Sequence, residues 1–286
     1  MLNEENRQAW NAATTAHNSH RPDPAPYFRN GGSTLYPEEV GLLGDLAGKR
    51  VLHLQCNVGH DSLSLANLGA QVVGVDISDV AIDTAVRLSR ASGLAAAFHR
   101  ADVYTWLDQS ARSEPPFDVA FSSYGALMWL SNIEAWAQGV ARVLAPDGRL
   151  VVIDYHPFAL LFDPKGVRDA NYFAGGRPRS SINGLVDYVG EAGPAEAPWG
   201  FLEGVRGFVN PHRSHEFFWG VGEILSAVLS AGLRIEAFVE YPYSNGSIFE
   251  DMTRSTTYRG RYELTSGPNL PLMFSLVARR PAAAAQ

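Results

Sequence analysis

The segment between residues 51 and 78 constrains the fold more than any other part of the chain. The apolar run Arg50–Gln55 leads through a turn into the helical pattern Asp61–Leu68, and a second apolar run, Gln71–Asp76, ends on a carboxylate. Asp76 stands roughly 20 residues beyond the turn, the spacing at which an acid at a strand end meets the ribose of a bound nucleotide. The segment therefore predicts a strand–helix–strand unit that binds a nucleoside.

Apolar strand runs and helical runs continue to alternate along the chain. Because buried parallel strands are continuous apolar runs separated by helices, the pattern predicts an α/β fold whose parallel sheet is covered on both faces. The expected strands are Arg50–Gln55, Gln71–Asp76, Ala96–His99, Asp118–Ser122, Arg149–Tyr155, Leu233–Tyr241 and Leu272–Ala278. The expected helices are Leu2–Asn18, Pro37–Leu46, Asp61–Leu68, Val80–Ala91, Ile133–Leu144 and Gly222–Ala231.

Two stretches interrupt this alternation. A loop rich in Pro and Gly, Arg21–Thr34, follows the first helix, and residues 157–213 are rich in Gly, Pro and aromatic side chains without a clear period. Long irregular segments inside compact domains are usually lids or binding loops. We therefore expect the functional site to be covered by these two stretches.

The composition limits the partners and the compartment. The chain has 286 residues, of which 46% are hydrophobic, and its net charge is −7 with no run of Lys or Arg longer than a pair. These values predict no nucleic acid and no membrane as partners. Cys56 is the only cysteine, which excludes an intrachain disulfide and a cysteine-rich metal site, and no metal is expected. Since neither a signal-peptide pattern nor an apolar run of membrane-spanning length is found, a cytoplasmic monomer or homodimer is expected.

The turn after the first strand argues against a dinucleotide. A pyrophosphate must approach the backbone closely and needs glycine at three positions, which here hold Gln55, Asn57 and His60. Only Gly59 fits a looser spacing of glycines, and Asn is the residue that best adopts a left-handed conformation where glycine is absent. The turn therefore favours S-adenosylmethionine, whose ribose carries no phosphate, over NAD.

At this point the chain resembles the class I methyltransferases that use S-adenosylmethionine. The resemblance covers about residues 36–155 and rests on the loop Gln55–Gly59, on Asp76, on Asp102, on the run Phe117–Ser123 and on the run Val143–Val152. It implies that Asp76 binds the ribose, that Ile77 packs on the adenine and that Asp102 meets the adenine amino group beside Val103. His53 stands where the family usually has an acid. The full set of cofactor-binding residues implied is Gln55, Cys56, Asn57, Gly59, Asp61, Asp76, Ile77, Asp102, Val103 and Ser122.

Some of these residues also have a purely structural interpretation. Asp61 is as well suited to cap its own helix as to contact a ligand, Asp102 is also compatible with an ordinary loop acid, and Cys56 with a small packing residue.

The resemblance also implies the overall architecture. It predicts a Rossmann-like, mostly parallel seven-stranded sheet with an antiparallel last strand, an N-terminal helical cap and an insertion after strand five. We expect one methyltransferase domain over residues 1–286, divided into a cap (1–47), a cofactor-binding core (48–156), an acceptor-site insertion (157–213) and a C-terminal part of the sheet (214–280).

The acceptor should lie beyond the carboxyl ends of the strands, because ligands of open parallel sheets bind there. The aromatic side chains expected near this place favour a flat aromatic or heteroaromatic acceptor, although many of them also suit a small core of the insertion. His156 is the preferred base, since a neutral imidazole takes a proton near pH 7, but a loop histidine bonded to backbone fits as well. The predicted catalytic residues are His156, Tyr124 and Tyr27. The predicted substrate-binding residues are Tyr27, Phe28, Tyr124, Trp129, His156 and His215.

The predicted function is therefore methyl transfer from S-adenosylmethionine to a small molecule. The chain is similar to small-molecule methyltransferases of bacterial secondary metabolism and, more faintly, to enzymes that methylate carbon 3 of indoles in tryptophan-derived compounds. N- and O-methylation stay open. The alternatives are an NAD(P)-dependent oxidoreductase on a similar sheet and a non-catalytic nucleoside-binding module.

Overall fold

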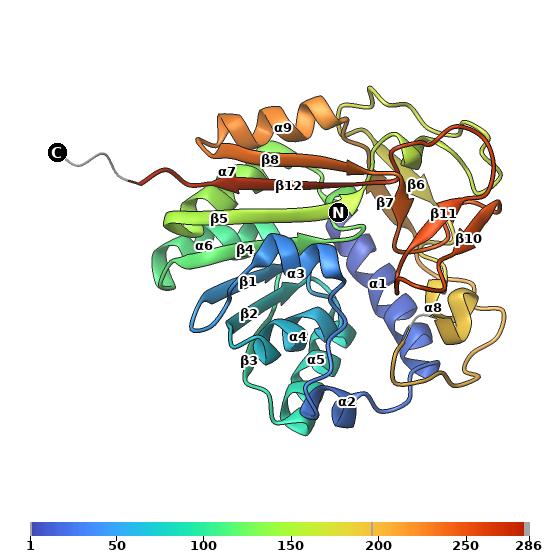
Figure 1. The fold of residues 1–286 in the computed structure, drawn as a ribbon, viewed down its shortest axis with the longest axis horizontal. Coiled ribbons are helices and arrows are strands. Elements are labelled where there is room, and N and C mark those ends of the chain that lie inside the picture. Colours follow the sequence, from blue (N-terminus) through green and yellow to red (C-terminus); the bar gives the residue numbers. More distant parts are fainter. Residues whose placement is uncertain (1, 196, 283–286) are drawn as a thin grey trace.

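The computed structural model describes residues 2–195 and 197–282, which fold around a seven-stranded sheet with the order β3-β2-β1-β4-β5-β12-β8 (Figure 1). Its strands are β1 (Arg50–Leu54), β2 (Gln71–Asp76), β3 (Ala96–Arg100), β4 (Phe117–Ser123), β5 (Leu144–Tyr155), β8 (Arg234–Tyr241) and β12 (Met273–Arg279). Strands β1 to β5 pair in parallel, whereas β12 is antiparallel to both of its neighbours, β5 and β8. The predicted α/β architecture with an antiparallel last strand is confirmed.

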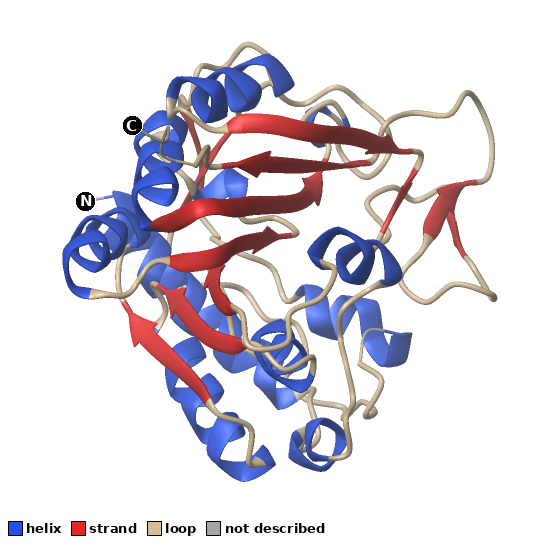
Figure 2. Ribbon diagram, turned by 60° about the vertical axis from the view of Figure 1, so that its left-hand side comes forward, coloured by secondary structure: helices blue, strands red, loops and turns tan. Residues whose placement is uncertain are grey.

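Helices cover both faces of this sheet (Figure 2). The helices are α1 (Leu2–Ser19), α2 (Ala25–Arg29), α3 (Pro37–Leu43), α4 (His60–Asn67), α5 (Asp79–Ser92), α6 (Val103–Ser113), α7 (Ile133–Val143), α8 (Tyr188–Ala192) and α9 (Val221–Ser230). Two of the starts follow directly from capping residues: the Ser78 hydroxyl accepts the Ala81 N–H at the start of α5, and the Asn132 side chain accepts the Ala135 N–H at the start of α7.

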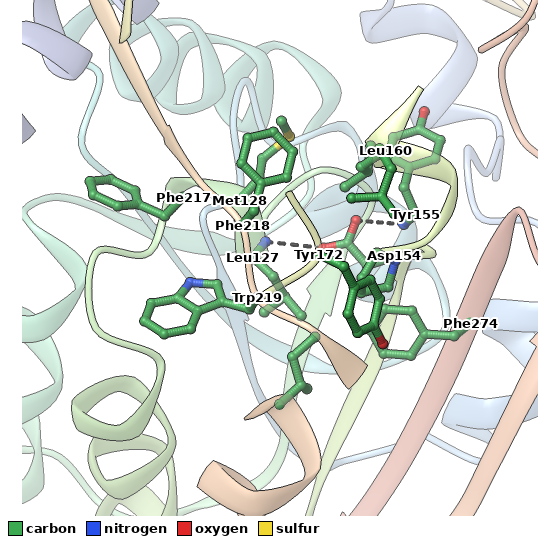
Figure 3. A pocket seen from close by; sticks show the side chains of 13 residues that line it. Leu127, Met128, Asp154, Tyr155, Leu160, Tyr172, Phe217, Phe218, Trp219 and Phe274 are labelled. Atoms are coloured by element: carbon green, nitrogen blue, oxygen red, sulfur yellow. Dashed lines mark hydrogen bonds between the residues drawn. The ribbon is translucent and has the colours of Figure 1, made fainter. Parts of the chain in front are cut away.

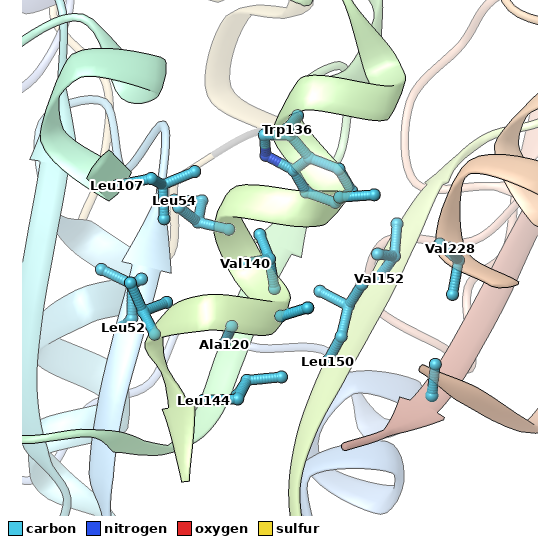
Figure 4. Packing of buried hydrophobic residues seen from close by; sticks show 14 of the residues in the cluster. Leu52, Leu54, Leu107, Ala120, Trp136, Val140, Leu144, Leu150, Val152 and Val228 are labelled. Carbon is cyan, nitrogen blue, oxygen red and sulfur yellow. The ribbon is translucent and has the colours of Figure 1, made fainter. Parts of the chain in front are cut away.

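The alternation of side chains along β1 divides the core into two layers. Leu52 and Leu54 point to the face covered by α6, α7 and α9 and belong to one cluster with the fully buried Trp136 of α7 (Figure 4). Val51 points to the opposite face and packs with Leu43 and Leu65 under α3 and α4. This period of two is the geometry of a strand, and both layers hold the strand ends at fixed positions for the site.

Several elements differ from the sequence-based expectation. Helix α6 follows β3 where no helix was expected, α2 lies within the expected loop, and α3 ends at Leu43 because Gly44 has φ 58°. The stretch expected to be irregular contains β6 (Pro178–Ser181) and α8, and β6 pairs with β7 (Ser214–Phe217). A further small sheet, β9 (Tyr243–Ser244), β10 (Met252–Arg254) and β11 (Tyr262–Leu264), precedes the last strand.

Strands β6, β7, β10 and β11 and helix α8 gather at one end of the central sheet, beside α1 (Figure 1). Buried amide side chains join them. The Asn6 side chain donates to the His215 carbonyl (2.9 Å) and accepts from the His215 N–H (2.7 Å), and Asn210 donates to the Ala9 carbonyl (2.9 Å). Helix α1 and the insertion therefore form one cover over this end. None of the helices in the described ranges is both long and apolar enough to cross a membrane.

Candidate functional site

A cavity of about 850 Å³ lies between the carboxyl ends of the parallel strands and the cover. It is lined by the ends of β1, β2 and β4, by α1, by the insertion and by the segment after β9; its lining includes Trp10, Tyr36, Glu39, Gln55, Asn57, Asp61, Asp76, Ile77, Asp102, Val103, Tyr124, Trp129, Tyr155, Trp199 and Asn245. Its volume lies in the upper part of the usual range for small-molecule sites, which is roughly 300–1,000 Å³. The cavity therefore has room for a nucleoside and a second small molecule.

The turn after β1 adopts the backbone that the sequence predicted for a turn poor in glycine. Gln55 has φ 50°, Asn57 has φ 49° and Gly59 has φ 77°, all in the left-handed region. Local bonds hold this shape: the Cys56 N–H donates to the Val75 carbonyl (3.0 Å), and the Gly59 N–H donates to the Cys56 carbonyl (3.0 Å). The expectation that Asn adopts the left-handed conformation here is confirmed.

Asp76 lies at the end of β2 and lines the cavity. Its Oδ2 accepts the Asn57 N–H and its Oδ1 accepts the Ser78 N–H, both at 2.8 Å. Burial raises the pKa of this carboxyl, while the N–H donors of Ser78 and Asn57 oppose that shift. Since a carboxylate oxygen accepts two hydrogen bonds, each oxygen keeps one acceptor position for a ligand, which matches a pair of ribose hydroxyls.

Asp102 lies at the end of β3 and lines the same cavity, but it is already engaged in structural contacts. Its Oδ1 caps α6 by accepting from the N–H groups of Tyr104 (3.1 Å) and Thr105 (3.2 Å), and its Oδ2 accepts from the Asn3 amide (2.7 Å). Ile77 and Val103 line the cavity beside the two acids. The contact of Asp102 with an adenine amino group stays a prediction.

Three predicted cofactor residues have a strongly structural environment. Cys56 lines the cavity, yet burial raises the pKa of its thiol, so it does not have the character of a nucleophile. Ser122 is fully buried inside β4 and does not line the cavity. Asp61, in the first turn of α4, accepts the Thr34 hydroxyl (2.5 Å) and lines the cavity.

Glu39 is a site residue that the sequence did not single out. Its Oε2 accepts the Tyr36 N–H (2.7 Å) as part of the capping box of α3, and its side chain lines the cavity although only 1% of the residue is exposed. Burial raises the pKa of Glu39 well above its usual value, and the charge of Asp61 adds to that shift. In the sequence, the pair Glu38–Glu39 indicates only acids near a helix start, and no local pattern predicts that Glu39 lines a cavity.

The loop after β4 brings Tyr124 into the site. Tyr124 has φ 28°, an unusual value for a residue with a side chain. Buried Asp154 of β5 holds this loop by accepting the N–H groups of Leu127 (3.0 Å) and Gly125, as well as its neighbour Tyr155 (2.7 Å), as Figure 3 shows in part. A small cavity of about 20 Å³ behind the loop shares three residues with the large one, Met128, Tyr155 and Leu160, and is too small for a ligand.

Aromatic side chains form much of the remaining wall. Trp10 of α1 and Trp129 after β4 meet edge to face with ring centres 5.4 Å apart. The rings of Tyr36 and Tyr124 also meet edge to face, at 5.8 Å, and Trp199 of the insertion lines the cavity as well. The predicted residues Tyr124 and Trp129 therefore lie at the cavity.

Besides His156, three other predicted substrate-binding residues do not line the cavity. Phe28 is fully buried in a separate cluster with Ala25, Leu63 and Leu88, and the Tyr27 hydroxyl donates to the Ser33 carbonyl (2.7 Å). Buried His215 binds Ser180 (2.7 Å) through Nδ1 and Glu5 (2.5 Å) through Nε2. These three side chains are occupied in holding the cover in place.

His156, the predicted base, does not line the cavity, and its catalytic role stays a prediction. Its Nδ1 accepts the Phe158 N–H (3.1 Å), and its Nε2 lies 3.0 Å from the Glu240 carboxylate. Burial lowers the pKa of His156, while Glu240 opposes that shift. Nδ1 is therefore engaged by backbone, as in the backbone-bonded alternative, whereas Nε2 lies beside a carboxylate without a hydrogen-bond partner among the described residues.

The described residues fit an S-adenosylmethionine-like ligand. Besides the free acceptor positions of Asp76, four residues that line the cavity carry buried polar atoms without a hydrogen-bond partner in the described part of the chain: Glu39 Oε1, Gln55 Oε1, Trp199 Nε1 and Asn245 Oδ1. Buried polar atoms are nearly always paired, so such a group around one cavity indicates a polar ligand. Within residues 2–195 and 197–282, no cluster of three or more His, Cys, Asp or Glu side chains is placed to hold a metal ion.

Comparisons with known proteins agree with this fold. The family model described as a methyltransferase domain matches residues 51–148. A demethylmenaquinone methyltransferase from Thermus thermophilus is 33% identical over 132 residues, which cover 44% of this chain and 54% of that protein. An S-adenosyl-L-methionine-dependent Diels-Alderase, iccD, from Talaromyces variabilis is 32% identical over 115 residues, which cover 40% and 39%. The chain spans about half the length of the curated relatives that it matches.

A solved structure extends the similarity in fold to nearly the whole chain. The CcbJ methyltransferase from Streptomyces caelestis has a TM-score of 0.58 at 16% identity, covering 97% of this chain and 99% of that one. The fold defines a protein of the Rossmann-like α/β class. Within it, residues 51–148 match a methyltransferase domain and are similar to S-adenosylmethionine-dependent enzymes, in agreement with the resemblance.

Proposed function

We propose that this protein transfers a methyl group from S-adenosylmethionine to a small aromatic or heteroaromatic acceptor. The observation that carries the proposal is the continuity of one cavity of about 850 Å³. It joins the nucleoside crevice at Asp76 to the space walled by Trp10, Trp129 and Tyr124. A methyl donor and its acceptor would thus share one enclosed space.

The cofactor half of this cavity would be held by the core. Asp76 would accept the ribose hydroxyls, Ile77 and Val103 would pack on the adenine, and Gln55 and Asn57 would shape the turn under the ligand. When bound, S-adenosylmethionine supplies a methyl group on a positively charged sulfonium sulfur. The acceptor takes this methyl group, and the neutral thioether S-adenosylhomocysteine is the leaving group. The protein would then act mainly by holding the acceptor atom in line with that methyl group in a site poor in water.

The acceptor half supports a flat ring. Aromatic walls bind such rings by edge-to-face and stacked contacts, each worth about 0.5–1.5 kcal/mol beyond buried area. An electron-rich carbon, such as carbon 3 of an indole, attacks a methyl group with little help from a base. This chemistry agrees with the position of His156 outside the cavity lining, so we propose an indole of a tryptophan-derived compound as the first acceptor to test.

The test combines binding and turnover. Calorimetric titration should show binding of S-adenosylhomocysteine and none of NADPH; the reverse result would favour the oxidoreductase alternative. Incubation with S-adenosylmethionine and a mixture of indole, tryptamine and tryptophan should release S-adenosylhomocysteine, and mass spectrometry should show a product in which one hydrogen is replaced by methyl. Binding without any release of S-adenosylhomocysteine, from these and from phenolic and amine acceptors, would instead favour a nucleoside-binding module or a cyclase, the activity in the name of the Talaromyces relative.

A further inference from the structure

Two carboxyl groups face the cavity near the tip of β1, away from Asp76. Glu39 comes from α3 and Asp61 from the first turn of α4, and both line the cavity. Glu39 uses Oε2 for the Tyr36 N–H, whereas its Oε1 is buried and has no hydrogen-bond partner among the described residues. A buried carboxylate oxygen without a partner costs free energy, which is recovered if a donor from a ligand meets it.

The two carboxyl groups act on each other. The negative charge of Asp61 is, after burial, the largest influence that raises the pKa of Glu39. The Asp61 carboxylate accepts the Thr34 hydroxyl at 2.5 Å. Two acids that share a low-dielectric space repel each other unless a cation lies between them.

The positive groups nearby do not balance this pair. Arg259 lowers the pKa of Glu39, but its Nη2 donates to the carbonyls of Thr34 (2.8 Å) and Leu35 (2.9 Å), so its charge is directed at backbone. His53 lies on β1 below the pair, and burial lowers its pKa to about 4, so its ring is neutral near pH 7. Neither Arg259 nor His53 therefore directs a positive charge at the two carboxyl groups.

The neighbouring walls also suit a cation. The rings of Tyr36 and Tyr124 meet edge to face at 5.8 Å, and both side chains line the cavity. The Tyr124 hydroxyl lowers the pKa of Glu39, as expected of a donor close to that carboxyl. Aromatic faces attract ammonium groups by about 0.5–2 kcal/mol, depending on solvation.

We propose that Glu39 and Asp61, with the rings of Tyr36 and Tyr124, form a binding site for a primary ammonium group. The inference rests on the proposed function, because it places two ligands in the cavity. The ammonium group has two possible sources: the amino group of the methionine part of the cofactor, or an amine carried by the acceptor. In both cases its N–H groups donate to Glu39 Oε1 and to the Asp61 carboxylate.

The first experiment tests the cofactor as the source. S-adenosylhomocysteine and 5′-methylthioadenosine share the nucleoside and the sulfur, but only the former carries the amino group. Both are titrated by calorimetry into the wild-type protein and into the variants Glu39→Gln and Asp61→Asn. Each variant should weaken the affinity for S-adenosylhomocysteine about tenfold, as expected for the loss of a charge-assisted hydrogen bond. The affinity for 5′-methylthioadenosine should change by less than about twofold.

Both variants keep their structural contacts, since Gln accepts the Tyr36 N–H and Asn accepts the Thr34 hydroxyl. The matched control is Glu38→Gln, which changes the adjacent acid; Glu38 accepts the Tyr243 hydroxyl (2.6 Å) and does not line the cavity. This control should leave both affinities unchanged. An equal loss in the control would show that any acid of α3 matters, which would overturn the proposal.

The second experiment tests the acceptor as the source, using benzylamine and benzyl alcohol as probes with and without saturating S-adenosylhomocysteine. A loss of benzylamine affinity in Glu39→Gln and Asp61→Asn, with benzyl alcohol unchanged, would assign the site to an amine of the acceptor. The two variants could also keep the wild-type ratio of affinities for S-adenosylhomocysteine and 5′-methylthioadenosine, and for benzylamine and benzyl alcohol. In that case the ammonium site does not exist. Failure of the proposed function has a different result: the wild-type protein would then bind neither nucleoside, whereas the amine titration without cofactor still reports on the acid pair.

Discussion

Replacing Asp76 by Ala should weaken the binding of S-adenosylhomocysteine by about two orders of magnitude. Each carboxylate oxygen has one acceptor position left after the backbone bonds to Asn57 and Ser78, so two ribose hydroxyls can be bound. A hydrogen bond to a charged group contributes about 1.5–3 kcal/mol. The sum of about 3–6 kcal/mol is an upper value, because water can enter the space left by the carboxylate, and about 3 kcal/mol corresponds to a factor of roughly 100.

The variant Asp76→Asn provides an intermediate step. Its amide oxygen can still accept from Ser78 and from one hydroxyl, whereas its NH2 group faces the Asn57 N–H and cannot accept it. We expect a loss of about tenfold, between the wild type and Asp76→Ala. Asp83→Asn is the control, since Asp83 is exposed on α5 and does not line the cavity.

Calorimetry at a temperature well below the unfolding transition measures these affinities. Removing Asp76 also leaves two N–H donors of the turn without acceptors, which should lower the free energy of unfolding by about 1–3 kcal/mol. Thermal unfolding without ligand separates this effect from the loss of binding. Unchanged affinity in Asp76→Ala, with the variant still folded, would refute the placement of the ribose at the end of β2.

Three further predictions concern stability and are checked by urea unfolding. Burial lowers the pKa of His17 and of His53 to about 4, whereas the pKa of a histidine in the unfolded chain is near 6.5. Between these pH values the unfolded chain binds more protons than the folded protein, so the free energy of unfolding should fall from pH 7 to pH 5 by about 2 kcal/mol for each histidine. A free energy of unfolding that does not change with pH over this range would contradict this. Asn6→Ala should cost about 1–3 kcal/mol, because it leaves the N–H and carbonyl of His215 buried without partners, whereas an unchanged midpoint would show that the cover is not fixed through this bond. Trp136→Ala should cost about 3–5 kcal/mol by opening a cavity in the larger core layer, and a loss under 1 kcal/mol would mean that the layer collapses to fill it.

The central sheet was predictable because its signals are local. Buried parallel strands are continuous apolar runs, and the helix starts after β2 and before α7 carry their own capping residues, Ser78 and Asn132. Helix α6 was missed although Val103, Trp106, Leu107 and Ser110 form its buried side at helical spacing. Asp102 and Val103 combine two roles, since they line the cavity and also begin this helix, and their residue types alone do not distinguish the two.

The acceptor side was less predictable because its contacts join residues far apart in the sequence. Whether His156 has a free nitrogen depends on Glu240 of β8, and whether His215 is available depends on Glu5 of α1. Similarly, Glu39 becomes a cavity residue only because α3 is placed over the tip of β1. A pattern of residue types along one segment contains none of this information.

The cofactor half and the acceptor half of the cavity are held in place by different kinds of contact. The cofactor half is formed by strand tips and by a turn whose hydrogen bonds are short in sequence, and its geometry follows from the packed sheet. The cover, in contrast, is fixed by polar bonds across the chain: Asn6 to His215, Asn210 to Ala9, and Asn11 of α1 to Asp79 at the start of α5 (2.9 Å). Polar anchors of this kind tolerate changes in the loops between them, whereas strand tips packed in the core do not. We therefore expect substitutions in residues 157–213 to alter acceptor selectivity while leaving the affinity for S-adenosylhomocysteine unchanged, because the two halves of the cavity are built on separate supports.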